Sequence, residues 1–323
     1  MNQTATDGSR LAHLPVSIFA MVMGLSGLTL AWQKAAETLA TPAAVATALF
    51  LLAALVFAFL CLAYGTKLVR HRAAVAAELN HPVRLAFFPT ISIGLILLAT
   101  AARPLAPDLS LALWWAGTTA HLAFTLYVIN AWIFHDRFQI QHSNPAWFIP
   151  VVGNILVPLA GVPHGHPEIS WFFFSLGLVF WPVLMTVIVY RLVFHPPLPA
   201  KLLPTLFILI APPAVGFLSY LKLAGGVDAF ARVLYYFGLF LTLFLAVQAP
   251  RFLRLRFFLS WWAYSFPVAA ITAATLSMAH ATGEPFLHGL AILLLALLSL
   301  RLAILFGRTV LAALRGEICV PEE

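Results

Sequence analysis

Histidines are the residues of this sequence whose type and spacing come nearest to a metal site. His135 and His142 lie in the stretch HDRFQIQH, and His164 and His166 lie in VPHGHPE. Neither pair has a third ligand at a fixed spacing, whereas structural zinc sites use four ligands. We therefore interpret both pairs as solvated loop histidines, and we predict neither a metal nor a cofactor.

Residue patterns typical of enzymes are missing from the sequence. It contains no phosphate-binding loop, no GxSxG nucleophile elbow and no recognisable pairing of a nucleophile with a base. We therefore predict that the chain is not an enzyme. An enzyme embedded in the membrane remains the weakest of three hypotheses for its function.

The composition indicates that the chain is an all-α integral membrane protein. Of its 323 residues, 62% are hydrophobic and only 9% are charged, and the mean hydropathy is +0.97. Soluble domains carry about 25% charged residues, so a soluble fold is excluded. The net charge of +7 comes from Lys and Arg residues scattered singly at the ends of apolar segments. This scatter argues against a nucleic acid as a partner.

Ten apolar segments are long enough to cross a bilayer, which takes about 20 residues. They are residues 13–32, 43–64, 84–102, 109–131, 146–162, 168–194, 202–223, 228–249, 257–280 and 285–307. The segments predict a cytoplasmic N-terminal tail over 1–12, a ten-helix transmembrane channel domain over 13–308 and a cytoplasmic C-terminal tail over 309–323.

The basic residues predict the orientation of these segments. Fourteen of the 18 Lys and Arg residues fall on the side that holds both termini. The other side has only Lys34, Arg103, Lys222 and Arg232. Since cytoplasmic loops carry an excess of Lys and Arg, both termini are predicted to lie in the cytoplasm.

Prolines recur in the odd-numbered segments and indicate an internal repeat. The prolines that we expect to kink pore-lining helices are Pro15, Pro89, Pro150, Pro213 and Pro267. The steps from Pro89 to Pro150, Pro212 and Pro267 are 61, 62 and 55 residues. A repeat of this length predicts a fold of five quasi-repeated helical hairpins. We expect an inner ring of odd, kinked helices around a pore and an outer ring of even helices.

The middle of the predicted membrane segments contains no Asp, Glu, Lys or Arg. Coupled transporters usually need an ionisable residue there, so its absence favours a channel over a coupled carrier. His121 could still serve as a proton site, although it lies on an even segment that we expect outside the pore. The groups that remain are glycines, hydroxyls and backbone dipoles. They bind anions weakly, which suits conduction.

Phe266 stands directly before Pro267 in the apolar stretch SWWAYSFPVAAIT, residues 260–272. Proline removes a backbone donor and kinks a helix, and it disfavours the helical region for the residue before it. We therefore expect the backbone of Phe266 to lie outside that region. Position alone leaves two roles for this ring. It either plugs a narrow pore, blocking ions sterically and by dewetting, or it is a packing residue among 27 phenylalanines.

Three stretches resemble the tellurite-resistance/dicarboxylate transporter family, which includes the plant guard-cell slow anion channels and bacterial homologues. They are ELNHPVRLAFFPT, NPAWFIPVVGN and WWAYSFP, and the resemblance runs from about Leu14 to Leu314. It implies ten helices as five hairpins, a pore through each protomer, a homotrimer and a place in the bacterial inner membrane. In that family a phenylalanine of the ninth helix occludes the pore, and Phe266 matches it.

The resemblance leaves more than one transport function open. We expect an anion channel that conducts small monovalent anions such as chloride and nitrate, with the lipid bilayer as its environment. The alternatives are a proton-coupled carrier for dicarboxylates such as malate or succinate, or an exporter of tellurite- or sulfite-type oxyanions.

Reporter fusions test the predicted topology. A reporter fused after Glu323 should lie in the cytoplasm, and one inserted near His164 should lie on the opposite side, because the basic residues are divided so unequally. An alkaline phosphatase and a fluorescent protein at each site give opposite activities in the two compartments. The same compartment for both sites would contradict the arrangement in ten segments.

Overall fold

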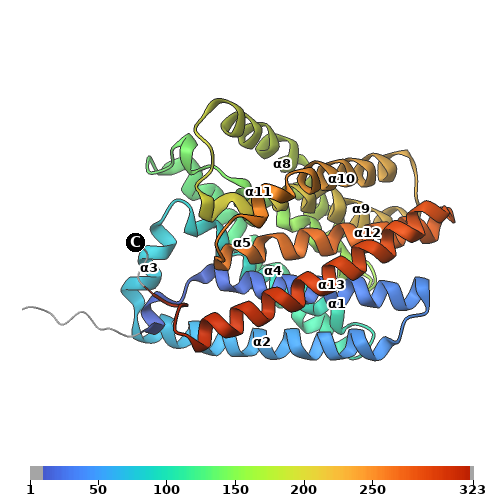
Figure 1. Cartoon of the computed structure of the whole chain (residues 1–323), viewed down its shortest axis with the longest axis horizontal. Helices are drawn as coiled ribbons and strands as arrows, with labels where there is room; N and C mark the ends of the chain where they lie inside the picture. The colour runs from blue at the N-terminus through green and yellow to red at the C-terminus, as the bar shows by residue number, and fades with distance from the viewer. Residues whose placement is uncertain (1–9, 321–323) are drawn as a thin grey trace, which may run out of the picture.

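Within residues 10–320, which the computed structural model describes, all regular secondary structure is helical (Figure 1). Residues 1–9 and 321–323, which hold most of the predicted N-terminal tail and the end of the C-terminal one, lie outside the described part. The last helix, α13, runs to Leu314, past the predicted end of the domain at residue 308.

Seven helical stretches are long and apolar enough to cross a membrane. They are Val16–Leu39, Ala43–Arg70, Arg84–Ala102, Pro167–Phe194, Ala200–Ala224, Ala229–Val247 and Pro285–Leu314. The chain is therefore a multi-pass membrane protein. The other predicted segments are helical too: α5 (Pro107–Phe134), the interrupted stretch Pro145–Gly161, and η8 (Leu259–Tyr264) with α12 (Ser265–Thr282). That all ten cross the bilayer stays a prediction.

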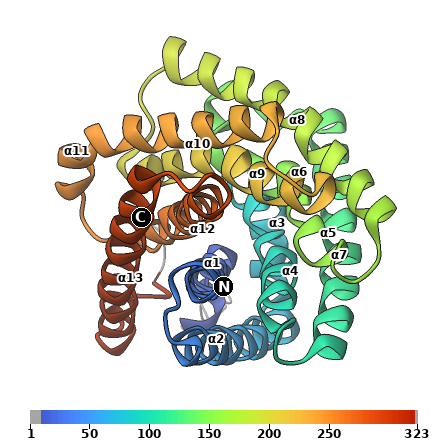
Figure 2. The same cartoon turned by 90° about the vertical axis from the view of Figure 1, so that its right-hand side faces the viewer.

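The helices divide into an inner and an outer set. Figure 2 shows α1 (Ala20–Leu39), α4 (Thr90–Ala102), α9 (Ala211–Ala224) and α12 inside a rim of other helices. The rim consists of α2 (Ala43–Arg70), α5, α8 (Pro167–Phe194), α10 (Ala229–Val247) and α13 (Pro285–Leu314). Burial follows this division. In the three inner spans 72, 78 and 72% of the most apolar window is buried, against 22 to 33% in the four outer ones.

Each inner segment begins as a 3₁₀ helix and continues as an α-helix. The 3₁₀ helix η2 (Val16–Phe19) leads into α1, η3 (Arg84–Phe87) lies just before α4, η7 (Ala200–Ile210) leads into α9, and η8 leads into α12. The fifth segment alternates between the two types, as η5 (Pro145–Trp147), α6 (Phe148–Val152), η6 (Gly153–Leu156) and α7 (Pro158–Gly161). Such changes of helix type inside a membrane protein often mark functional regions.

The repeated prolines lie at these changes of helix type. Pro89 is the N-cap of α4, and Pro150, Pro213 and Pro267 are each the third residue of an α-helix. The first turn is where proline does least harm, because its N–H groups have no acceptor inside the helix. Pro15 differs, since it is the N-cap of η2 and precedes the 3₁₀ turn.

The prediction that Pro267 pushes Phe266 out of the helical region is wrong. Phe266 is the second residue of α12 and is helical, like Tyr264 and Ser265 before it. The conformational bias of a residue before proline is a preference that tertiary packing can outweigh. Here α1 packs closely on α12, and Gly27 of α1 lies against the ring and backbone of Phe266.

A buried ion pair holds the entry of the first inner segment. Nζ of Lys67 lies 2.6 Å from Oε2 of Glu78, and the side chains are 1% and 5% exposed. Glu78 lies on the short helix α3 (Arg72–Asn80). Its Oε1 accepts the N–H of Val16 at 3.1 Å, and Tyr64 donates to Oε2 at 2.8 Å. Lys67 also donates to the carbonyl of Leu14 at 2.8 Å. The pair therefore fixes the chain on both sides of Pro15.

Replacing Glu78 by alanine should destabilise the protein strongly. The change leaves the Lys67 ammonium buried without its counter-charge, which typically costs about 3–5 kcal/mol. Thermal unfolding of the purified protein in detergent measures the loss. The exposed pair of Lys34 and Glu37, with N and O 2.9 Å apart, provides the control. Glu37→Ala should change the melting temperature little, and an equal effect of both substitutions would contradict a special role for Glu78.

Candidate functional site

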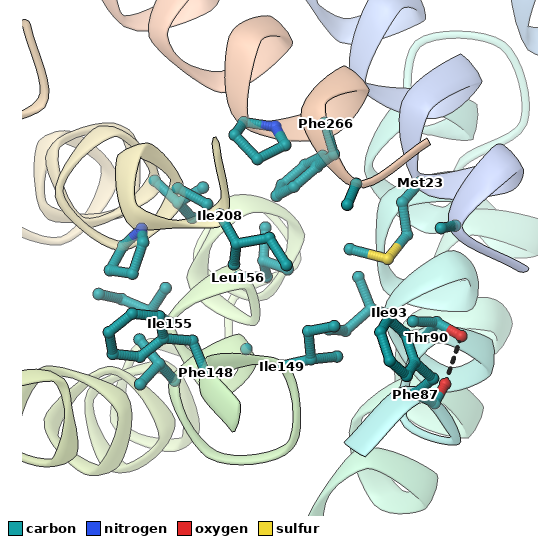
Figure 3. A pocket seen from close by; sticks show the side chains of 18 of the residues that line it. Met23, Phe87, Thr90, Ile93, Phe148, Ile149, Ile155, Leu156, Ile208 and Phe266 are labelled. Carbon is teal, nitrogen blue, oxygen red and sulfur yellow. Dashed lines mark hydrogen bonds between the residues drawn. The ribbon is translucent and has the colours of Figure 1, made fainter. Parts of the chain in front are cut away.

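An apolar cavity lies where the inner segments change from 3₁₀ to α-helix (Figure 3). All five inner segments contribute to its wall, for example through Met23, Ile93, Leu156, Val215 and Phe266. No outer helix does so. The inner segments therefore surround a space in the interior of the protein.

A second, smaller cavity lies further along the same helices. On α1 its wall contains Gly27 and Leu30, whereas the first cavity touches Ala20 and Met23. Three residues line both cavities, namely Leu156, Val215 and Phe266. These three side chains therefore form the partition between two spaces that follow one another along the bundle.

Phe266 belongs to this partition because α1 comes very close to α12. Its side chain is 7% exposed, and Figure 3 shows the ring projecting into the larger cavity. A methyl group on Gly27 would lie 3.2 Å from Cδ2 of Phe266 and 2.8 Å from Cβ of Ala269. One turn earlier, a methyl group on Gly24 would lie 2.7 Å from Cβ of Ser265. The two glycines thus allow the contact that places the ring.

The wall of the larger cavity offers an ion almost no polar group. It contains no Asp, Glu, Lys, Arg or His, and Thr90 is its only hydroxyl side chain. The hydroxyl of Thr90 donates to the carbonyl of Phe87 at 2.5 Å, as the dashed line in Figure 3 marks. An ion in this space therefore has no charged partner to hold it tightly.

Polar side chains lie behind this apolar wall and serve the backbone at two of the prolines. Ser92 donates to the carbonyl of Pro89 at 2.9 Å, and Nδ1 of His121 lies 2.9 Å from the same hydroxyl. Thr125 donates to the carbonyl of Pro150 at 2.7 Å. Asn154 donates to Oγ1 of Thr125 at 2.9 Å. The sequence analysis singled out only His121 of these four residues.

The predicted site residues separate into those that line the cavities and those that do not. Phe266 and Pro267 line the larger cavity, and Pro212 does so in place of its neighbour Pro213. Pro15, Pro89 and Pro150 line neither cavity. The carbonyl groups of Pro89 and Pro150 instead accept hydrogen bonds from the hydroxyls of Ser92 and Thr125, which lie behind the cavity wall.

The pair of His164 and His166 makes specific contacts, unlike solvated loop residues. Nε2 of His164 lies 2.8 Å from the hydroxyl of Ser110, and His166 stacks on Trp114 with ring centres 5.1 Å apart. Burial, together with the charges of Arg103 and His166, lowers the pKa of His164. Among residues 10–320 no three His, Cys, Asp or Glu side chains gather as metal ligands would.

Basic residues gather where three inner helices end. Lys34 lies in the last part of α1, Arg103 follows α4, and Lys222 lies in the last turn of α9. Lys222 interacts electrostatically with Lys34 and Arg103, and also with Glu37. A field of net positive sign at one end of the inner bundle raises the local concentration of anions.

Comparison with known proteins places these features in a family context. The family model described as SLAC1, voltage-dependent anion channel, matches residues 13–310. The S-type anion channel SLAH3 of Arabidopsis thaliana is 28% identical over 310 residues, 94% of this chain and 49% of that protein. The guard cell S-type anion channel SLAC1 of the same plant is 25% identical over 97% of this chain and 58% of its own length. The tellurite resistance protein TehA homolog of Haemophilus influenzae is 25% identical over 94% and 92%. The chain thus spans about half the length of SLAH3.

Cysteine accessibility tests whether the inner segments border water. In a background with Cys61 and Cys319 replaced by serine, cysteines at Met23 and Ala263 should react with a small, anionic, water-soluble thiol reagent. Cysteines at Leu55 on α2 and Leu293 on α13, which are 68% and 54% exposed on the outer rim, should stay protected by lipid. Mass spectrometry of protein labelled in liposomes measures both sets. Equal labelling would contradict a water-filled path through the inner segments.

Proposed function

Because this chain belongs to the SLAC1 family of voltage-dependent anion channels, we propose that each protomer conducts small monovalent anions through its two cavities, with Phe266 as the gate. Anion transport is the function at the level of the family. The observation that supports Phe266 as the gate is that its side chain lines both cavities. Only Leu156 and Val215 share that position with it.

The ring of Phe266 closes the path in two ways. It occupies the cross-section of the partition, and it adds an apolar surface to a stretch that is apolar already. A narrow apolar constriction excludes water as well as ions, so conduction stops before steric contact is complete. Opening requires the ring to leave the partition. The backbone of α12 can stay in place, since the change is confined to one side chain.

The wall chemistry favours small monovalent anions such as chloride and nitrate. The wall of the larger cavity has one hydroxyl side chain and no charged one. An ion that enters it therefore loses hydrating water molecules and gains few polar contacts to replace them. That penalty is much larger for a dicarboxylate with two charges. Weak binding also lets an ion leave as easily as it enters, as conduction requires. The basic residues Lys34, Arg103 and Lys222 at one end of the inner helices would draw anions to the path.

The wider architecture follows from the same assignment. We propose that all ten helical segments of the domain 13–308 cross the membrane as five hairpins, with both termini in the cytoplasm. The membrane is the bacterial inner membrane, and three identical protomers assemble with one pore each. The buried inner set and exposed outer set of helices support this arrangement.

A second function has one observation in its favour. The Haemophilus relative is called a tellurite resistance protein homolog, which points to export of oxyanions. A carrier of this kind, or a proton-coupled carrier for dicarboxylates, would need a site that titrates or binds tightly. The described wall of the larger cavity offers no such site directly, so the channel is the better-supported function.

Truncation of the gate is the decisive test. Phe266→Ala removes the steric block and the dewetted stretch together, so anion current in planar bilayers should rise by about tenfold or more. Chloride and nitrate should carry it down their gradients without a proton gradient. Stability should fall little, because one side of the ring faces a cavity and not packed side chains.

Phe217→Ala is the matched control for this experiment. Phe217 is fully buried on α9 and packs on the ring of Tyr235, with ring centres 5.5 Å apart. Truncating such a packing residue typically costs about 3–5 kcal/mol and should produce no current. If Phe266→Ala behaves like Phe217→Ala, with lost stability and no added current, Phe266 is a packing residue and the proposed gate is wrong.

A further inference from the structure

His121 is a titratable group in the middle of the protein that the proposed conduction path does not use. It lies on the outer helix α5 and is 0% exposed. The hydroxyl of Ser92 gives its hydrogen to the carbonyl of Pro89, so it accepts the hydrogen of Nδ1 of His121. Nε2 therefore carries the lone pair of the ring, and it has no hydrogen-bond partner.

A single glycine lies between this nitrogen and the larger cavity. Gly153 is part of the cavity wall. A methyl group on Gly153 would lie 2.8 Å from Nε2 of His121. Glycine therefore allows the imidazole of an outer helix to come within one residue of the path. A proton on Nε2 would place a positive charge directly behind a wall that otherwise has none.

No charged side chain is available to pair with an imidazolium at this position. Four elements that pack against α5 are α4, α6, η6 and α7, and none of them contains an ionisable residue. Toward its two ends α5 also meets Leu85 of η3 and Leu79 of α3, whose helices carry Arg84 and the Glu78 that pairs with Lys67, and His164 and His166 contact Ser110 and Trp114. None of these groups pairs with His121. On α5 itself the other titratable residues are Asp108, in the first turn, and Tyr127, which is 41% exposed. Neither interacts with His121. An unpaired buried charge is costly, so protonation needs a counter-charge from elsewhere.

We propose that His121 and the adjacent cavity form a joint binding site for one proton and one small anion. The proton comes from the aqueous phase and binds the lone pair of Nε2, while the anion occupies the cavity on the other side of Gly153. Each partner supplies the charge that the other lacks, so each raises the affinity of the other by the same factor. Acid therefore strengthens anion binding. The inference rests on the proposed function, because it takes the cavity to be the anion path.

A purely structural role of His121 makes a different prediction. A neutral imidazole that only supports Ser92 would ignore both pH and anions. His121→Gln separates the two roles, because a glutamine amide can still donate a hydrogen bond to Ser92 but cannot bind a proton in this pH range. His288→Gln on the outer helix α13 is the matched control, since Nδ1 of His288 lies 3.1 Å from the backbone carbonyl of Glu284 and His288 lines neither cavity.

The direct test is magnetic resonance of full-length protein in lipid, labelled with ¹⁵N in the histidine rings. The signal that disappears in His121→Gln identifies His121. On acidification from about pH 8 to about pH 5, the ordinary titration range of histidine, nitrate should convert this signal from neutral to protonated at a higher pH than gluconate does. A signal that stays neutral throughout, or that ignores nitrate, would overturn the proposal.

Flux through the opened channel provides the second test. In proteoliposomes, chloride flux through Phe266→Ala should rise several-fold over the same acidification, and the rise should be lost when His121→Gln is added. Adding His288→Gln should leave the rise unchanged. Flux without any pH dependence would contradict the joint site and leave the channel standing. No flux at all would contradict the channel, and the resonance measurement would then decide the fate of the His121 site alone.

Discussion

The hydrocarbon core of a membrane provides no hydrogen bonds, so every backbone group in it needs a partner within the protein. Helices that change type or carry prolines can exist there only if other side chains reach the freed groups. The stretch Pro145–Gly161, which changes helix type three times, shows how this is achieved. Thr125 and Trp114 of α5 donate to the carbonyls of Pro150 and Val157, and Ser219 of α9 donates to Ile155. The interrupted segment is tolerated because regular helices surround it.

This requirement also explains why the polar and apolar groups of the inner bundle are separated. The hydroxyls and amides that satisfy broken backbone lie behind the cavity wall, on outer as well as inner helices, and the apolar side chains are left to face the cavity. Ser92, Thr125 and Asn154 are all fully or almost fully buried, yet none of them lines either cavity. The cavity wall is thus apolar as a consequence of how the helices are held. In the proposed channel such a wall would give shallow binding sites, which suit conduction.

The sequence predicted the features that depend on local pattern, and it missed those that depend on distant partners. Apolar length predicted ten segments that are all helical in the structure, and the spaced prolines lie where the helix type changes, because both are properties of one stretch of chain. The short helix α3 was not predicted. The salt bridge of Lys67 and Glu78 escaped notice, since its partners meet only when α3 folds back on α2. The helical backbone of Phe266 was mispredicted for the same reason, because contact with Gly27 outweighs the preference set by Pro267. The place of His121 beside the path depends on a glycine of another segment.

Small residues around Phe266 would allow the proposed gate to move inside a tightly packed bundle. Beyond the ring, the smaller cavity is lined by Gly27 and by Ala269, Ala270 and Ala273 of α12. Side chains of this size leave space into which a rotating ring can move without displacing a helix. Interiors that are packed to normal density resist such motion, because a moved ring must displace other atoms. The same glycine that brings α1 close enough to position the ring therefore belongs to the wall of the space that would receive it. In the proposed channel, the contact between α1 and α12 at Gly27 therefore both positions the ring of Phe266 and borders the space into which the ring would move.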